Sequence, residues 1–188
     1  MAADNIYLDA AAFAYLRGGR FAAVVAALAA LHKRGLVVAG RPGTVHRTER
    51  YDIEPPGFEH VVWHALHGSV SPAGLTLRPP VERATADLRR QLRDAGLIRP
   101  LLPMTSWAPV RNSRGYEALR LCRQEHPFAI DRPETSGDDV AWLVALYGND
   151  ALRQLMPAFA RAGGLFDKSA TDDMVGAEPD NPGGAPAV

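Results

Sequence analysis

The chain has 188 residues, of which 47% are hydrophobic and 22% charged, and its 21 basic and 21 acidic residues give a net charge of zero. This composition excludes collagen, a coiled coil and a wholly disordered chain, and it is less basic than a protein that depends on attraction to phosphate. The single cysteine, Cys122, excludes an internal disulfide framework and any multi-cysteine zinc or iron-sulfur site.

No targeting or membrane segment is evident in the sequence. Residues 1–9 lack the basic and apolar pattern of a secretory signal. The longest apolar runs, 21–31 and 140–147, are shorter than the roughly 18 residues that a membrane helix needs. We therefore expect a cytoplasmic protein that does not enter a membrane.

Two apolar helices are predicted near the start of the chain. The first covers Ala10 to Leu16 and ends at Gly18-Gly19. The second covers Arg20 to Arg34, where large apolar residues recur at helical spacing, and Gly35 supplies its C-terminal stop.

A β-hairpin is predicted directly after these helices. The Gly/Pro turn 40–43 separates two β-favouring runs, 36–39 and 44–48. Helix, turn, helix and hairpin is the order of a winged-helix module, which we assign to residues 1–54.

The same order begins again in residues 55–112. Helices are predicted over 58–66 and 81–95, and this second winged-helix-like module ends in a Pro-rich connector. Both halves carry the pattern Leu-x-x-x-Gly-Leu at the end of a helix, starting at Leu31 and at Leu92. A tandem pair of related modules is therefore predicted.

Three more helices are predicted in the C-terminal segment 113–166, over 113–124, 137–147 and 149–162. The acidic tail 167–188 has almost nothing apolar to bury, and we expect it to be disordered. The sequence thus predicts a mainly α protein with small β-hairpins, made of tandem winged-helix-like modules and C-terminal helices.

Three blocks of sequence carry a resemblance to a known family. They are Tyr15-Leu16-x-Gly18-Gly19, Arg114-Gly115-Tyr116-x-Ala118-Leu119 and Ala145-Leu146-Tyr147-Gly148-x-x-Ala151-Leu152. The chain resembles an uncharacterised actinobacterial family of membrane proteins with a conserved cytoplasmic domain. Members of that family commonly carry membrane spans between the second and third blocks and end in Gly/Cys-rich tails, and this chain has neither.

The family has no established activity, so the resemblance implies an architecture more than a function. Genes of such proteins often lie beside enzymes that modify ribosomally made peptides, including a family of multinuclear non-haem iron oxidases. The resemblance therefore implies an accessory protein that recognises a peptide or serves as the partner subunit of such a metalloenzyme.

The predicted hairpin is the candidate partner-binding site. An unpaired strand edge takes up a peptide as an added strand, and basic side chains beside it favour an acidic peptide. The candidate residues are Val37, Val38, Arg41, Val45, Arg47 and Arg50. An ordinary two-stranded wing with solvent-facing arginines accounts equally well for this pattern.

Charge is distributed unevenly along the chain. Residues 11–50 hold seven basic residues and one acid, whereas residues 134–188 hold three basic residues and nine acids. Either the basic region meets an acidic partner, or the two regions of the chain face each other.

Three histidines form a row on the predicted helix 58–66 and just beyond it. His60, His64 and His67 have the spacing i, i+4 and i+7, which places them on one side of a helix, within reach of a common metal ion. No carboxylate was found to orient them, so a polar face or a partner contact is the favoured interpretation, and metal binding is the minor one.

A DNA-binding transcriptional regulator is the alternative function. The winged-helix order and the basic residues Arg41 and Arg47 on the wing favour it. Against it, the helix 20–34 presents an alanine face without a side chain that reaches base edges, and this face suits burial under another helix. On the helix 81–95, arginines alternate with acids, a pattern typical of a solvated face.

Independent catalysis is not expected. The sequence contains no Gly-rich phosphate loop, no Gly-x-Ser-x-Gly and no His-Glu-x-x-His motif. Cys122 follows apolar residues on a predicted helix and is expected to be a packing thiol. We therefore predict a non-catalytic protein without a cofactor.

Overall fold

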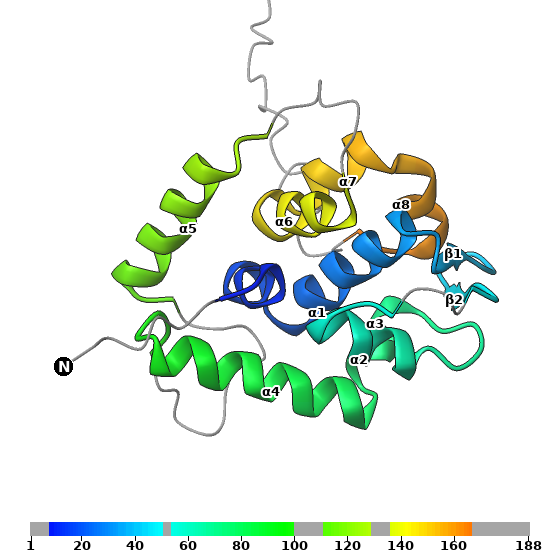
Figure 1. The fold of residues 1–188 in the computed structure, drawn as a ribbon, viewed down its shortest axis with the longest axis horizontal. Helices are drawn as coiled ribbons and strands as arrows, with labels where there is room; N and C mark the ends of the chain where they lie inside the picture. Colours follow the sequence, from blue (N-terminus) through cyan, green and yellow to red (C-terminus); the bar gives the residue numbers. More distant parts are fainter. Residues whose placement is uncertain (1–7, 51–53, 100–110, 129–135, 167–188) are drawn as a thin grey trace, which may run out of the picture.

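The computed structural model describes residues 8–50, 54–99, 111–128 and 136–166. Within these ranges the chain is mainly helical and carries one two-stranded antiparallel hairpin, which confirms the predicted fold class (Figure 1). In chain order the elements are α1 (Ala10–Lys33), β1 (Val37–Ala39), β2 (Val45–Arg47), α2 (Gly57–Ala65), α3 (Pro72–Thr76), α4 (Pro79–Asp94), α5 (Ser113–Glu125), α6 (Gly137–Tyr147), α7 (Asn149–Leu155) and α8 (Pro157–Gly163).

Helix α1 is the centre of the fold. It packs most extensively against α6 and also contacts α2, α3, α4 and α5, so that the other helices surround it (Figure 1). Its sequence is apolar around the whole circumference, and a helix of that kind is stable when it is buried on all sides. The buried hydrophobic residues of the described chain form a cluster to which every helix except α3 contributes at least two side chains, and α3 contributes Leu75.

Two glycines interrupt α1 where the sequence predicts a break between two helices. Gly18 and Gly19 have non-helical backbone angles, and Gly19 has a φ of 72°, which favours glycine. A Cβ at Gly18 would lie 2.9 Å from the Cβ of Ala22. The two predicted helices therefore exist, joined by a sharp kink.

The hairpin pairs Val37 with Arg47 and Ala39 with Val45. Its tip is fastened to the C-terminal helices, because the amide of Gly43 donates a hydrogen bond to the carbonyl of Ala162 at 2.7 Å. The hairpin lies at one end of the molecule, beside α8 (Figure 1).

Helix α3 was not predicted, whereas α4 follows its predicted pattern. Ser71 caps α3 by accepting a hydrogen bond from the Gly74 amide, and Pro72 starts the helix. In α4 one apolar face is buried and the remainder is charged. The buried residues of α4 are Val81, Thr85, Leu88 and Leu92.

The predicted helix over 149–162 is divided into α7 and α8, so that prediction was wrong in this detail. Pro157 has no N–H to donate within a continuous helix, and it starts α8. Met156 before it has the non-helical angles φ −150° and ψ 56°. Helix α6 begins as predicted, with a capping box between Ser136 and Asp139.

Among the described residues, α1 alone is long and apolar enough to cross a membrane. Inside the fold, 78% of its most apolar window is buried, as in the core helix of a folded domain, so its length and composition are weak evidence for a span. The predicted disordered tail 167–188 and most of the Pro-rich connector lie outside the described residues. The division into two winged-helix-like modules stays a prediction.

Candidate functional site

The helix that carries the alanine face, α1, makes its most extensive contact with the chain's own C-terminal helix α6. The alanines of this face are at most 4% exposed. They are Ala22, Ala23, Ala26, Ala27, Ala29 and Ala30. Burial under another helix is therefore confirmed, and the covering helix belongs to the same chain. In a winged-helix protein this helix would read bases, whereas here its alanines are buried.

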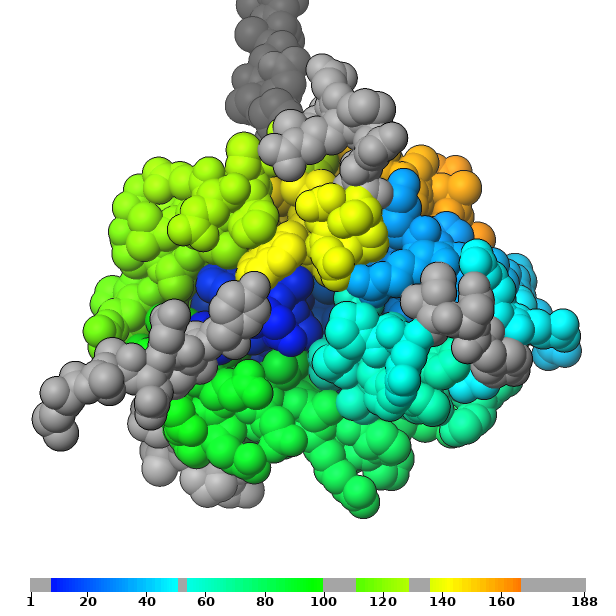
Figure 2. Space-filling view, viewed as in Figure 1, coloured from blue at the N-terminus to red at the C-terminus, as the bar shows by residue number. Residues whose placement is uncertain are grey.

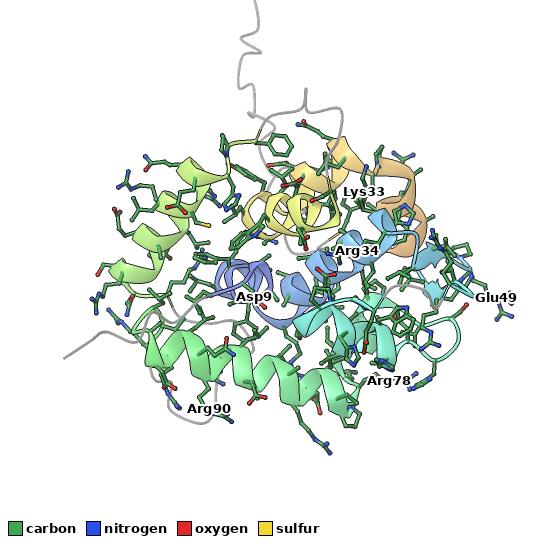
Figure 3. The ribbon with its side chains drawn as sticks, viewed as in Figure 1. Asp9, Lys33, Arg34, Glu49, Arg78 and Arg90 are labelled. Carbon is green, nitrogen blue, oxygen red and sulfur yellow. The ribbon has the colours of Figure 1, made fainter. Side chains whose placement is uncertain are left out.

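Arg34, at the C-terminal end of α1, connects three helices. Its guanidinium is paired with Glu59 on α2 and with Asp138 on α6, the latter at 2.6 Å. Arg34 is labelled in Figure 3. The side chain lies flat over Gly137, since a Cβ there would be 2.8 Å from Nε of Arg34. Of the two interpretations of the uneven charge, Arg34 and Asp138 support the one in which the basic and acidic regions of the chain face each other.

The three blocks that carry the family resemblance meet around the kink of α1. Arg17 donates a hydrogen bond from Nε to the carbonyl of Ala145 at 2.8 Å, at the C-terminal end of α6. A Cβ at Gly148 would lie 2.6 Å from Nη1 of Arg17, and a Cβ at Gly115 would lie 3.4 Å from Cδ1 of Leu16. These residues hold the helices together, and they form packing contacts between the blocks.

Val37 and Val45, two of the candidate partner-binding residues, are buried in the structure. Both side chains are 0% exposed and belong to the core. The carbonyl of Val37 is hydrogen bonded to the ring of His32 at 2.8 Å. Val45 exchanges both backbone hydrogen bonds with Val70, at 2.9 and 3.0 Å, so β2 already has a neighbour there. A peptide strand added at Val45 would have to displace Val70.

A groove opens immediately beyond this bridge. It has a volume of about 450 Å³ and lies between the end of β2 and the segment that follows α2. Its lining residues are His46, Arg47, Leu66, His67, Gly68 and Ser69. The groove thus brings together Arg47 from the predicted partner site and His67 from the predicted histidine row, which were separate in the sequence analysis.

His46 and Ser69 are groove residues that the sequence analysis missed. Nδ1 of His46 is buried and has no hydrogen-bond partner within the described residues. Next to Gly40, the atoms Nδ1 of His46, Oγ of Ser69 and Oγ1 of Thr44 lie 2.9, 3.0 and 3.1 Å from the position of an added Cβ. Successive side chains of a strand point to opposite faces, so the apolar Val45 was the available signal that His46 faces the other way.

The remaining candidate residues of the hairpin differ in exposure. Arg41 is exposed at the tip, Val38 is half-buried, and Arg50 is exposed near Gly35. The guanidinium of Arg47 lies over the ring of Trp63, 4.3 Å from its centroid. Trp63 is 6% exposed and therefore fixes the position of the Arg47 charge on the groove wall.

The predicted histidine row is divided by the end of α2. His60 and His64 lie on the helix, with ring centroids 4.2 Å apart. His67 comes after Leu66, whose ψ of 85° leaves the helix, and it lines the groove. A carboxylate is also present, because Oε1 of Glu54 lies 3.2 Å from Nδ1 of His60. The expectation that no carboxylate orients these histidines was therefore wrong.

Two further hollows lie elsewhere on the molecule. One, of about 290 Å³, lies between the start of α1, α2 and α6, and Asp9 and Glu59 stand among its apolar lining residues. On the face shown in Figure 2, the first half of α1 (dark blue) is seen between α6 (yellow) and α4 (green). The other, of about 230 Å³, lies at the junction of α6 and α7 and includes Arg17 and Gly148.

Cys122 is a packing thiol, as expected. It is 5% exposed, and burial together with the nearby Glu125 carboxylate raises the pKa of the thiol to about 11. A thiol that stays protonated at neutral pH is a poor nucleophile and a poor metal ligand. Glu125 and His126 lie close to it.

Several arginines of α4 and its neighbourhood are already paired with acids. Arg90 contacts Asp87 at 2.8 Å, and Arg93 contacts Asp94 at 3.2 Å. Glu82 accepts a hydrogen bond from Arg20 of α1 at 2.9 Å. The solvated, mixed-charge face predicted for this helix is confirmed, and these pairs weaken its attraction for phosphate.

No family model matches the chain, and neither the curated proteins nor the solved structures contain a match to it. The resemblance to the actinobacterial family therefore stays a prediction.

Proposed function

We propose that this chain is a non-catalytic, cytoplasmic accessory protein that binds an acidic segment of a peptide or protein partner in the groove beside its hairpin. The observation that carries the proposal is the lining of that groove, where Arg47, His46, His67 and Ser69 converge. Arginine, imidazole and hydroxyl groups are all suited to hold carboxylates by hydrogen bonds.

The mode of binding differs from simple addition of a strand to the hairpin. The edge of β2 is occupied at Val45 by Val70, and the two chain segments separate beyond this bridge. An extended segment placed there lies between Arg47 on one side and residues 67–69 on the other. Arg41 and Arg50 add positive charge close to the same end of the molecule.

The resemblance supplies the class of partner for this proposal. The acidic segment would belong to a ribosomally made precursor peptide or to the metalloenzyme that modifies it, and the chain would act as its recognition or partner subunit. A multinuclear non-haem iron enzyme is the partner that this resemblance favours.

The DNA-binding alternative receives little support from the packing. The face of α1 that would enter a groove of DNA is covered by α6, and neighbouring arginines of α4 are paired with acids. We therefore make it an outcome of the test and do not propose it as a second function.

The test compares two synthetic peptides with the full chain, by fluorescence anisotropy. One peptide alternates valine with glutamate, and the other alternates valine with lysine. We expect saturable binding of the acidic peptide and a loss of about tenfold in Arg47→Gln, because one charge-assisted contact is removed. The matched control is Arg90→Gln, which changes an exposed arginine on α4 and should leave the affinity unchanged.

Three results would overturn the proposal. The basic peptide binds as tightly as the acidic one, or Arg47→Gln and Arg90→Gln lose the same affinity for the acidic peptide. The third is that the chain binds duplex DNA more tightly than the peptide, with an affinity that falls steeply as salt rises. Because Arg47 packs on Trp63, circular dichroism of both variants is recorded to confirm that the fold is intact. Arg41→Gln provides a second variant at an exposed position outside the core.

A further inference from the structure

Three metal-ligating side chains lie together where the chain enters α2. They are Glu54, His60 and His64, and one donor atom from each lies within 4.8 Å of the other two. His60 and His64 are four residues apart on the helix, which places both rings on the same side, tilted by 51° to each other. This set differs from the predicted row, because Glu54 takes the place of His67.

The position of Glu54 follows from the two prolines after it. A residue before proline is restricted to extended backbone, and Pro56, the residue before the helix, is itself extended with φ −82° and ψ 157°. Pro55 is buried, so this short extended segment is anchored against the fold. The Glu54 side chain is 78% exposed and is therefore able to rotate toward either ring.

We propose that Glu54, His60 and His64 form a site for a divalent transition-metal ion, with zinc as the best match. Imidazole nitrogen and carboxylate oxygen are ligands for zinc and its first-row neighbours, whereas calcium and magnesium take oxygen ligands. Ligand bonds to zinc are about 2.0 to 2.2 Å long, so two donors on a tetrahedral ion lie about 3.4 Å apart. Glu54 Oε1 and His60 Nδ1 already lie 3.2 Å apart, and rotations of the side chains would bring all three donors to this spacing.

Two neighbouring contacts favour the site. One restricts the movement of a ligand, and the other engages a nearby carboxylate that could otherwise compete for the metal ion. The ring of Trp63 lies edge-on to His64, with centroids 4.9 Å apart, and limits the movement of that imidazole. Glu59, the nearest other carboxylate on α2, is paired with Arg34. Three protein ligands leave the fourth position of a tetrahedral zinc ion open for water or for a side chain of a partner.

This inference does not depend on the proposed peptide groove, although Trp63 contacts one residue of each. The same indole ring contacts both His64 and the guanidinium of Arg47. The metal site and the groove therefore have separate residues and separate tests.

The experiment measures zinc binding to the full chain after treatment with a chelator, by isothermal titration calorimetry. Cobalt(II) is the second probe, since its visible absorption reports on ligand number and geometry. We expect one zinc ion per chain, and affinity at least about tenfold lower in His60→Ala and in His64→Ala, because each loses a ligand. Glu54→Gln should show a smaller loss, since an amide oxygen is a weaker ligand than a carboxylate.

The matched controls are His67→Ala and His126→Ala, which remove exposed or half-buried imidazoles outside the proposed site. The site is refuted by the absence of saturable zinc binding, by binding that persists in the double variant His60→Ala/His64→Ala, or by an equal loss in His67→Ala. Thermal unfolding gives an independent readout. Zinc should raise the thermal unfolding midpoint of the unaltered chain and leave the midpoint of the double variant unchanged, because only a folded state that contains the site is stabilised by binding zinc.

Discussion

Helices α1 and α4 are both long and lie side by side, but they occupy opposite environments. In α1 the side chains are apolar on every side, and 16 of its residues are buried. In α4 four residues are buried, and charged side chains cover the rest (Figure 3). An apolar circumference therefore marks the central helix of this fold, whereas a single apolar face marks a peripheral one.

The arginines of the two helices differ in the same way. Arg17, Arg20 and Arg34 of the α1 region bond to groups on other elements, namely the Ala145 carbonyl, Glu82 and the pair Glu59 and Asp138. Arg90 and Arg93 of α4 contact acids on their own helix. Part of the positive charge in residues 11–50 thus stabilises the fold and is not available to a partner.

The largest effect in this comparison of buried and exposed positions is expected at Gly115, where α5 packs against both α1 and the segment after α4. An added Cβ would overlap the carbonyl oxygen of Leu97. We expect Gly115→Ala to lower the free energy of unfolding by more than about 3 kcal/mol, since backbone must shift to accommodate it. Ser113→Ala, at an exposed position of the same helix, should change it by less than about 0.5 kcal/mol. Urea denaturation measures both, and equal values would contradict the close packing around α1.

A second test compares two arginines, Arg34 and Arg90. Arg34 and its partner Glu59 have side chains that are only 15% and 12% exposed. We expect Arg34→Met to cost about 2 to 3 kcal/mol, because it leaves a largely buried carboxylate unpaired. Arg90→Met should cost less than about 1 kcal/mol, because its pair with Asp87 is exposed. Similar costs in thermal unfolding would mean that Arg34 does not hold α2 and α6 to α1.

A third test enlarges one residue on each helix. Ala30 of α1 is 0% exposed, and Ala30→Leu should cost about 1 to 3 kcal/mol through overpacking. Arg83 of α4 is exposed, and Arg83→Leu should change the stability by less than about 0.5 kcal/mol. The midpoints of denaturant unfolding give the comparison. A tolerated leucine at Ala30 would show that α6 does not cover that face tightly.

The smallest expected effect concerns Tyr15 of α1, near the boundary with α4. Burial raises the pKa of its phenol, and the positive charges of Arg89 and Arg20 oppose that increase. Arg89→Gln should raise the pKa of Tyr15 further, as measured by ultraviolet absorption of the phenolate. Because the folded-state pKa is raised, Tyr15 contributes stability that is present below the unfolded pKa of about 10 and is lost as the pH rises through the folded value. A pKa lowered by Arg89→Gln would contradict this placement.

Much of the fold was predictable because it depends on local pattern. The kink at Gly18-Gly19, the hairpin and the start of α6 at Ser136 all follow from glycine positions and capping residues. The two predicted faces, apolar in α1 and mixed in α4, also follow from composition. Helix α3 was missed because five residues are too few to show a helical period.

The candidate site was less predictable, because it depends on contacts between distant segments. Nothing in the local sequence indicates that Val70 pairs with Val45, and that bridge both blocks the predicted edge and creates the groove beside it. Likewise, the proximity of Glu54 to His60 depends on where two prolines direct the chain. Spacing alone grouped His67 with His60 and His64, although the helix ends before it.

The central position of α1 affects how the chain folds while it is being synthesised. The helix ends at Lys33, but α6, which covers its alanine face, begins only at Gly137. During translation the surface of α1 that packs against α6 therefore lacks its partner until most of the polypeptide has left the ribosome. Such delayed long-range pairing slows folding. In the meantime a chaperone can bind the apolar surface of α1.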